Sequence, residues 1–143
     1  MKIIPIGADH AGFQLKERIQ QYLTDLGYEV KDFGCFSEES IDYPDYAHPV
    51  SEMVQANPGM IGILICGSGN GINMTANKHA GIRSALCWKK EIAELARLHN
   101  NANIIALPAR FISYEEAKEM VEVFLTTEFE GGRHQKRVEK IAL

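Results

Sequence analysis

One stretch, from Ile61 to Gly71, constrains the fold of this chain more than any other segment. It reads Ile-Gly-Ile-Leu-Ile-Cys-Gly-Ser-Gly-Asn-Gly, so a short apolar run passes directly into a loop with three glycines in five positions. An apolar run rich in β-branched residues is typical of a strand buried on both faces of a parallel sheet. The glycines permit unusual backbone angles and leave amide groups uncovered. The stretch therefore predicts a central strand that ends in a loop able to hold an oxyanion.

Cys66 stands where this predicted strand ends. A helix is expected over residues 72–78, so the thiol would lie beside backbone N–H donors and the positive end of a helix dipole. Such surroundings lower the pKa of a thiol. The alternative is a buried thiol that acts as a small apolar side chain, which is the commoner role of cysteine. We favour a functional Cys66, and we treat Cys35 and Cys87, which lack these surroundings, as structural.

Length and charge exclude several classes of protein. Residues 1–143 are expected to form a single domain. The formal net charge is -4, so the broad positive surface of a nucleic-acid-binding protein is not expected. No apolar run approaches the roughly 18 residues that a membrane helix needs, and we expect no signal region before the first strand. Three scattered cysteines predict neither a disulfide framework nor a zinc site. We expect a cytoplasmic enzyme with no metal, no cofactor, and no nucleic-acid or membrane partner.

The order of apolar segments predicts an α/β fold. Strands are expected at residues 2–7, 28–33, 61–65, 82–87 and 103–107. Helices are expected between residue 12 and Gly27, and at 46–56, 72–78, 89–98, 114–125 and 133–143. Strands that alternate with helices specify a parallel sheet covered on both faces. The expected fold is a three-layer α/β/α sandwich with a Rossmann-like, five-stranded parallel sheet and an additional C-terminal helix.

Polar residues follow three of the predicted strands. Asp9 and His10 follow the first strand, Cys66 ends the third, and Arg110 follows the fifth. Ligands of parallel sheets bind beyond the carboxyl ends of the strands, so these residues are expected to share a site. Asp9 and His10 could also be an ordinary helix cap. The glycine spacing G-x-G-x-G matches neither a dinucleotide fingerprint nor a Walker loop, which makes nucleotide binding the weaker option.

Other polar residues have a structural as well as a functional explanation. Ser68 could be a turn residue or a helix cap. His99 and Asn100 could be only the polar end of a helix. Arg133 and Arg137 are four residues apart behind two glycines, so they could form a solvated basic face or grip a phosphate. The residues alone leave these alternatives open.

Taken together, the motifs resemble those of the sugar-phosphate isomerase family typified by type B ribose-5-phosphate isomerases, over essentially the whole chain. The motifs that carry the resemblance are Gly7 to Gly12, Asp42-Tyr43-Pro44, Ile65 to Gly71, Ala76-Asn77-Lys78, Gly81-Ile82-Arg83, His99-Asn100 and Glu130 to His134. The family interconverts an aldose phosphate and its ketose, chiefly ribose 5-phosphate and ribulose 5-phosphate, through an enediolate and without a metal. One subgroup replaces the cysteine with a glutamate just after the last loop glycine. Ile72 occupies that position here, so Cys66 has no carboxylate substitute.

The resemblance implies a role for each candidate residue. Cys66 would be the base that moves a proton between C1 and C2, and His99 would assist opening of the furanose ring. Ser68 would relay protons between the two oxygens. The backbone amides that would stabilise the enediolate oxygen belong to Gly67, Ser68, Gly69, Asn70 and Gly71. The sugar hydroxyls or ring oxygen would contact Asp9, His10, Tyr43 and Asn100, and the phosphate would contact Arg110, Arg133 and Arg137.

Strand geometry adds an expectation about assembly. His99 precedes the fifth strand, whereas Cys66 lies at a carboxyl end, so about 13 to 17 Å would separate them at ~3.3 Å per strand residue. The two ends of one strand do not easily line one pocket. We therefore expect a second subunit to supply His99 and Asn100 across a two-fold interface. The resemblance likewise implies a homodimer or a dimer of dimers with shared active sites.

Three other functions are conceivable. The nearest is an isomerase of a six-carbon sugar phosphate, such as allose 6-phosphate or galactose 6-phosphate, because these relatives share the loop and the cysteine. The length of the pocket near Tyr43, Ser40 and His10 would decide between a five-carbon and a six-carbon sugar phosphate. A non-catalytic module that binds a sugar phosphate or a nucleotide is disfavoured, because binding alone would not need a base such as Cys66. A thiol-based hydrolase is disfavoured because no acid–base partner is evident beside that thiol.

Overall fold

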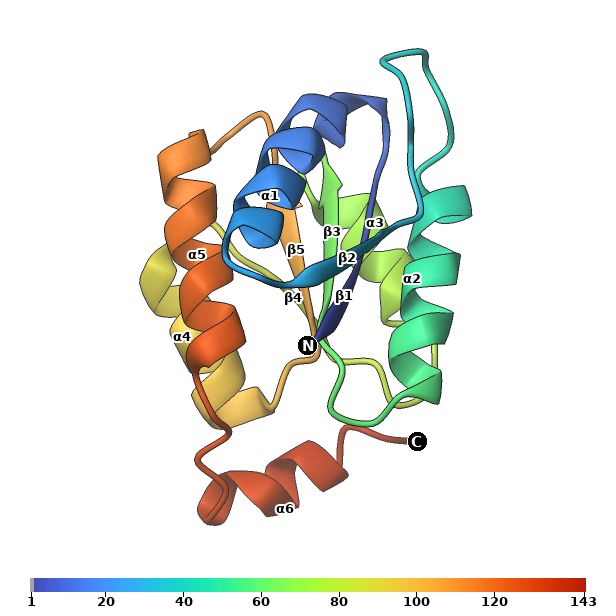
Figure 1. Cartoon of the computed structure of the whole chain (residues 1–143). Coiled ribbons are helices and arrows are strands. Elements are labelled where there is room, and N and C mark those ends of the chain that lie inside the picture. Colours follow the sequence, from blue (N-terminus) through green and yellow to red (C-terminus); the bar gives the residue numbers. More distant parts are fainter. Residues whose placement is uncertain (1) are drawn as a thin grey trace.

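The computed structural model describes residues 2–143, which form a five-stranded parallel sheet between two layers of helices (Figure 1). The strands are β1 (Ile3–Ala8), β2 (Glu29–Asp32), β3 (Gly62–Cys66), β4 (Ser84–Leu86) and β5 (Ile104–Pro108). They pair in parallel in the order β2-β1-β3-β5-β4. The predicted α/β/α fold class is therefore confirmed, and β3 is the central strand.

Helices cover both faces of the sheet. The first layer contains α1 (Phe13–Asp25), α4 (Lys90–Asn100) and α5 (Tyr114–Thr126), and the second contains α2 (Pro44–Ala56) and α3 (Asn70–Ala76) (Figure 1). The short helix α6 (Arg133–Glu139) crosses below the sheet and contacts α4. Among residues 2–143, no helix combines the length and the apolar character that crossing a bilayer requires.

The alternation of side chains along β3 divides the core in two. Ile63 and Ile65 belong to the apolar cluster beneath the first helix layer, whereas Leu64 and Cys66 belong to the cluster beneath α2 and α3. Every residue of β3 is buried. Burial on both faces explains why this strand is almost continuously apolar. It also places the thiol on the α2 and α3 side of the sheet.

Several predicted boundaries differ from the structure. The helix α3 begins at Asn70 and not at residue 72, because Gly69, with φ of +78°, ends the loop and lets the helix start at once. A 3-10 helix, η1 (His10–Gly12), precedes α1 and was not predicted. The last helix ends at Glu139 and not at residue 143. Strand β4 is limited to three residues, because Ile82 is already bonded to His79 in a turn.

A capping box at the start of α5 supports the first helix layer, and its loss is expected to be measurable. The Ser113 hydroxyl accepts a hydrogen bond from the Glu116 N–H at 3.1 Å, and the Glu116 carboxylate accepts one from the Ser113 N–H at 2.9 Å. We expect Ser113→Ala to lower the free energy of unfolding by about 1 kcal/mol in urea denaturation. Ser113→Asp, which keeps an acceptor at the cap, should retain most of that stability. Equal losses in both variants would contradict this account.

Candidate functional site

The carboxyl ends of β1, β3 and β5 meet at one edge of the sheet. Backbone hydrogen bonds join them: the Asp9 N–H donates to the Ile65 carbonyl at 3.2 Å, and the Arg110 N–H donates to the Gly67 carbonyl at 3.0 Å. The backbone carbonyl of Cys66 accepts a hydrogen bond from the Ala109 N–H at 2.9 Å. The structure thus brings together the three groups that the sequence placed at strand ends.

The loop after Cys66 needs its glycines because other groups approach its backbone closely. A Cβ atom on Gly67 would lie 3.0 Å from a guanidinium nitrogen of Arg110. A Cβ atom on Gly71 would overlap the ring of Tyr43, which lies directly against the loop. Gly69 has a left-handed backbone that disfavours side chains. The start of the loop therefore packs against Arg110, and its end packs against Tyr43.

The Cys66 thiol is buried, with 4% of its residue surface exposed. Burial raises its pKa, and the nearby Asp9 carboxylate raises it further. Backbone donors, first of all at Ile72, act in the opposite direction but do not outweigh burial. The expectation of a lowered pKa was therefore wrong, because sequence alone does not show how completely the thiol is removed from water.

Asp9 and His10 are held by the local backbone. The Asp9 carboxylate accepts a hydrogen bond from the Gly12 N–H at 3.1 Å, so it caps the short helix η1. His10 Nδ1 accepts a bond from the Ile41 N–H at 3.2 Å. That contact assigns the proton of a neutral imidazole to Nε2, which can then donate to a ligand.

Ser68, Asn70 and Tyr43 lie at the exposed border of the site. The Ser68 hydroxyl accepts a hydrogen bond from the Asn70 N–H at 3.3 Å, which is the turn role left open by the sequence. Both residues are exposed, and Tyr43 is 39% exposed. Each side chain can therefore reach a ligand that lies over the loop.

The segment of Gly34 and Cys35 is a neighbour of the site that the sequence did not predict. Ala8 N–H donates to the Gly34 carbonyl at 2.7 Å, and Cys35 N–H donates to the Ala8 carbonyl at 2.8 Å. Asp9 lies close enough to raise the pKa of the buried Cys35 thiol, although desolvation is the larger cause. No local sequence pattern indicates this contact, because the segment lies beside β1 only as a result of the order of the strands in the sheet.

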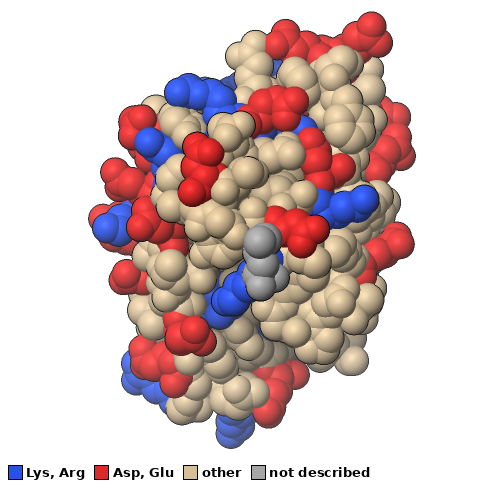
Figure 2. All heavy atoms as spheres, in the orientation of Figure 1, with Lys and Arg blue, Asp and Glu red and all other residues tan. Residues whose placement is uncertain are grey.

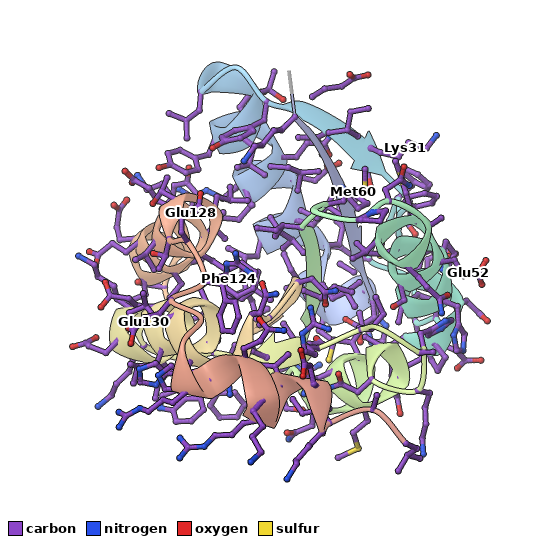
Figure 3. All side chains as sticks on the ribbon, turned by 90° about the horizontal axis from the view of Figure 1, so that it is seen from below. Lys31, Glu52, Met60, Phe124, Glu128 and Glu130 are labelled. Atoms are coloured by element: carbon purple, nitrogen blue, oxygen red, sulfur yellow. The ribbon has the colours of Figure 1, made fainter. Side chains whose placement is uncertain are left out.

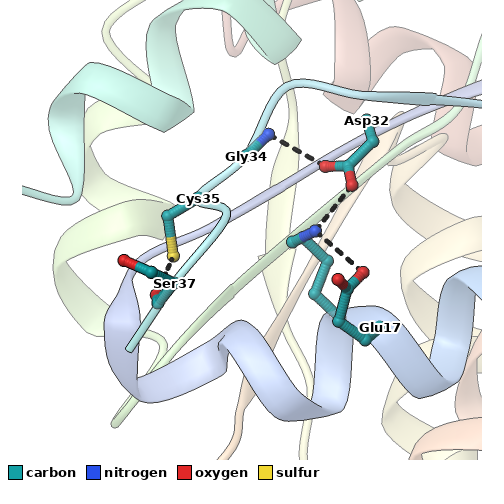
Figure 4. Close-up of polar contacts among 6 residues, drawn as sticks. Glu17, Asp32, Gly34, Cys35 and Ser37 are labelled. Carbon is teal, nitrogen blue, oxygen red and sulfur yellow. Dashed lines mark hydrogen bonds and ion pairs between the residues drawn. The ribbon is translucent and has the colours of Figure 1, made fainter. Parts of the chain in front are cut away.

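A buried ion pair supports that segment (Figure 4). The fully buried Lys16 ammonium lies 2.7 Å from Asp32 Oδ2 and 3.3 Å from Glu17 Oε2. The other oxygen of Asp32 accepts a hydrogen bond from the Gly34 N–H at 2.9 Å. Asp32 therefore links helix α1, the end of β2 and the chain that passes the site.

A second group of predicted site residues lies at the opposite, amino-terminal edge of the sheet. His99 is in the last turn of α4, and its ring stacks on that of His134 with centroids 4.2 Å apart. Arg133 and Arg137 are exposed on α6, which crosses below the same edge (Figure 1). Asn100 ends α4 and is exposed as well. Within one chain these residues do not join Cys66.

The face drawn in Figure 2 has mixed charge, and a separate hollow lies away from the site. Figure 2 shows lysine and arginine interspersed with aspartate and glutamate on the face it draws. A hollow of about 400 Å³ is lined by residues 77–83 and by Val138 and residues 141–143. Neither the thiol nor the glycine loop lines this hollow, so volume alone does not identify the candidate site.

Comparisons with known proteins agree over nearly the whole chain. The family model described as Ribose/Galactose Isomerase matches residues 4–141. The chain is 47% identical to ribose-5-phosphate isomerase B of Escherichia coli, over 99% of this chain and 95% of that protein. A crystal structure of a ribose 5-phosphate isomerase from Thermotoga maritima has a TM-score of 0.96 and 50% identity, covering 99% of this chain and 97% of the other. The Mycoplasma genitalium ribose-5-phosphate isomerase B, solved with bound ribulose 5-phosphate, has a TM-score of 0.94 and 42% identity, covering 97% and 93%.

The effect of Asp9 on the thiol can be measured. Because the Asp9 carboxylate raises the pKa of Cys66, Asp9→Asn is expected to lower that pKa while keeping an oxygen that can cap η1. The pH dependence of Cys66 alkylation, followed by peptide mass spectrometry, should then shift to lower pH. Asp25→Asn, at the exposed end of α1, is the matched control and should cause no shift. A shift to higher pH in Asp9→Asn would contradict this electrostatic assignment.

Proposed function

Since this chain belongs to the ribose/galactose isomerase family, we propose that it interconverts ribose 5-phosphate and ribulose 5-phosphate, with Cys66 as the catalytic base. One observation carries the assignment of the base. Cys66 lies at the carboxyl end of the central strand and leads directly into the glycine loop, where backbone N–H donors at Ile72, Gly69 and Ser68 are near enough to act on the thiol. A base beside preorganised N–H donors is the arrangement that enediolate chemistry needs.

The proposed proton transfer starts from the open-chain aldose. The Cys66 thiolate removes the proton from C2, and the electron pair moves toward the carbonyl to form an enediolate. The amides of the loop from Gly67 to Gly71 stabilise the negative oxygen, by roughly 3 kcal/mol for each well-placed donor. Ser68 relays a proton between the oxygens on C1 and C2. The thiol then returns its proton to C1, which yields the ketose and regenerates the thiolate without a metal.

The raised pKa of Cys66 bears on its proposed role as a base. A thiolate with a raised pKa is a stronger base, although a smaller fraction of it is ionised near neutral pH. The active form is the deprotonated one, so turnover should increase as the pH rises through the thiol pKa.

The substrate contacts follow from the borders of the loop. Asp9 and His10 Nε2 would bind sugar hydroxyls, with Tyr43 beside them. The Arg110 guanidinium, which packs on Gly67, would meet the phosphate. A guanidinium suits this contact because its planar donors match phosphate oxygens.

We further propose that a second subunit completes the site. His99 and Asn100 would reach the ring oxygen and hydroxyls from the partner, and Arg133 and Arg137 would add to the phosphate contact. The support is their position at the amino-terminal edge of the sheet, away from the thiol of their own chain (Figure 1). A two-fold dimer that joins the two edges would form two identical sites.

The first test measures ribulose 5-phosphate formation from ribose 5-phosphate in the presence of a metal chelator. Wild-type activity should persist, and Cys66→Ala should reduce turnover by about 10²- to 10⁴-fold, the contribution of a general base. Cys87→Ala removes a thiol from the core and should retain activity.

Retained activity in Cys66→Ala would remove this thiol from the mechanism. A wild-type chain inactive on the pentose would direct the same assay to allose 6-phosphate and galactose 6-phosphate. Inactivity on all three would favour the binding module.

Mixed subunits test whether the site is shared. Cys66→Ala and His99→Ala chains are each expected to be inactive alone, and to regain activity when they are unfolded together and refolded as a mixture. An equal mixture should reach about a quarter of wild-type activity, because half of the random dimers carry one intact site of two. Mixtures that stay inactive, in samples where mass spectrometry detects the heterodimer, would place both residues in one chain.

A further inference from the structure

Two imidazoles and a carboxylate form a cluster below the sheet. His99, Glu130 and His134 each offer one ligand atom, and these atoms lie within 4.8 Å of one another. They come from the end of α4, the segment before α6, and α6 itself. The Glu130 N–H donates to the Leu98 carbonyl at 3.1 Å, which holds the segment against α4. Figure 3 views the molecule from this side and labels Glu130 beside α4.

One atom of the cluster lacks a partner. His134 is buried, with 5% of its surface exposed, and its Nε2 has no hydrogen bond to any residue in 2–143. The nearest carboxylate oxygen, Glu130 Oε1, lies 3.6 Å away, which is too long for a hydrogen bond. A buried polar atom without a partner is unfavourable, so this nitrogen points to a missing ligand.

We propose that His99, Glu130 and His134 bind a divalent transition-metal ion, with Zn²⁺ the preferred one. Two imidazole nitrogens and one carboxylate oxygen are a recognised donor set for Zn²⁺. His99 is half-buried, so a fourth position stays open to water. The rings are nearly parallel, at 15°, and His99 must tilt to direct its lone pair at an ion shared with His134. Its partial exposure permits that movement.

Some charges around the cluster favour a bound cation, and others oppose it. His99 lies in the last turn of α4, where the negative end of the helix dipole favours a cation. Arg133, Lys136 and Arg137 on α6 oppose it, although all three are exposed to solvent. A reversible metal site, one that a chelator can empty, is the expected result.

Metal binding at this place would inhibit the isomerase. This part rests on the proposed function, in which His99 acts on the ring oxygen of the substrate. A His99 nitrogen that is bound to a metal has no lone pair or proton to offer the sugar. Zn²⁺ would therefore reduce turnover, and a chelator would restore it.

The experiment separates metal binding from activity. Metal-free protein is titrated with Zn²⁺ against a chromophoric chelator, and the same samples are assayed for isomerisation. We expect one ion per chain, and Glu130→Gln should weaken binding by at least roughly 10- to 100-fold, the loss that even the outer partners of a metal ligand cause. Glu130→Gln should also keep its activity at Zn²⁺ concentrations that inhibit the wild type. Glu139→Gln, which changes an exposed carboxylate at the end of α6, is the matched control.

Co²⁺ provides a spectroscopic check on the ligands. Absorption without thiolate-to-metal charge transfer is expected, and such a band would overturn the proposal because it would place the ion on a cysteine. Undiminished Zn²⁺ binding in Glu130→Gln would overturn it as well. Binding without inhibition would reject the inhibitory role alone. If the chain is inactive on every sugar phosphate, the proposed function is wrong, but the result for Zn²⁺ binding still stands.

Discussion

The parallel pairing of β3 with β1 and β5 is the constraint on which the other features depend. Ala8 pairs with Ile65, and Cys66 pairs with Pro108, so the three strands end at nearly the same level. Backbone hydrogen bonds alone therefore bring the residues that follow these strands to one edge. The same pairing buries β3 on both faces, which holds the thiol rigidly beside its loop and also raises its pKa.

A glycine turn, and not strand pairing, organises the amino-terminal edge of the sheet. Gly131 and Gly132 have φ of 71° and 56°, a region that side chains disfavour, and they turn the chain beneath α4. That turn brings α6 under the sheet and stacks His134 on His99. The chain thus carries two sets of polar residues at opposite edges, one built by strand ends and the other by helix ends.

Much of this arrangement was predictable, and the remainder depends on tertiary contacts. Apolar runs located the five strands, and the rule for parallel sheets placed Asp9, Cys66 and Arg110 at one edge. The order of strands is not contained in local pattern, so the position of Cys35 beside Ala8 was missed. The predicted direction of the shift in the Cys66 pKa was wrong, because burial of the thiol depends on how α2 and α3 pack. His134 was quoted only as part of a motif, since its burial arises from the stack with His99.

The pair of Lys16 and Asp32 has a consequence for how the sequence can diverge. Removing one member of a buried ion pair leaves an uncompensated charge, at a cost of about 3 to 5 kcal/mol, whereas replacing both by apolar groups is often nearly neutral. A single substitution at either position is thus expected to be removed by selection, whereas replacement of both residues is expected to be tolerated. Asp32 has an additional duty, because it also accepts from the Gly34 N–H. The two positions are therefore expected to change together and not one at a time.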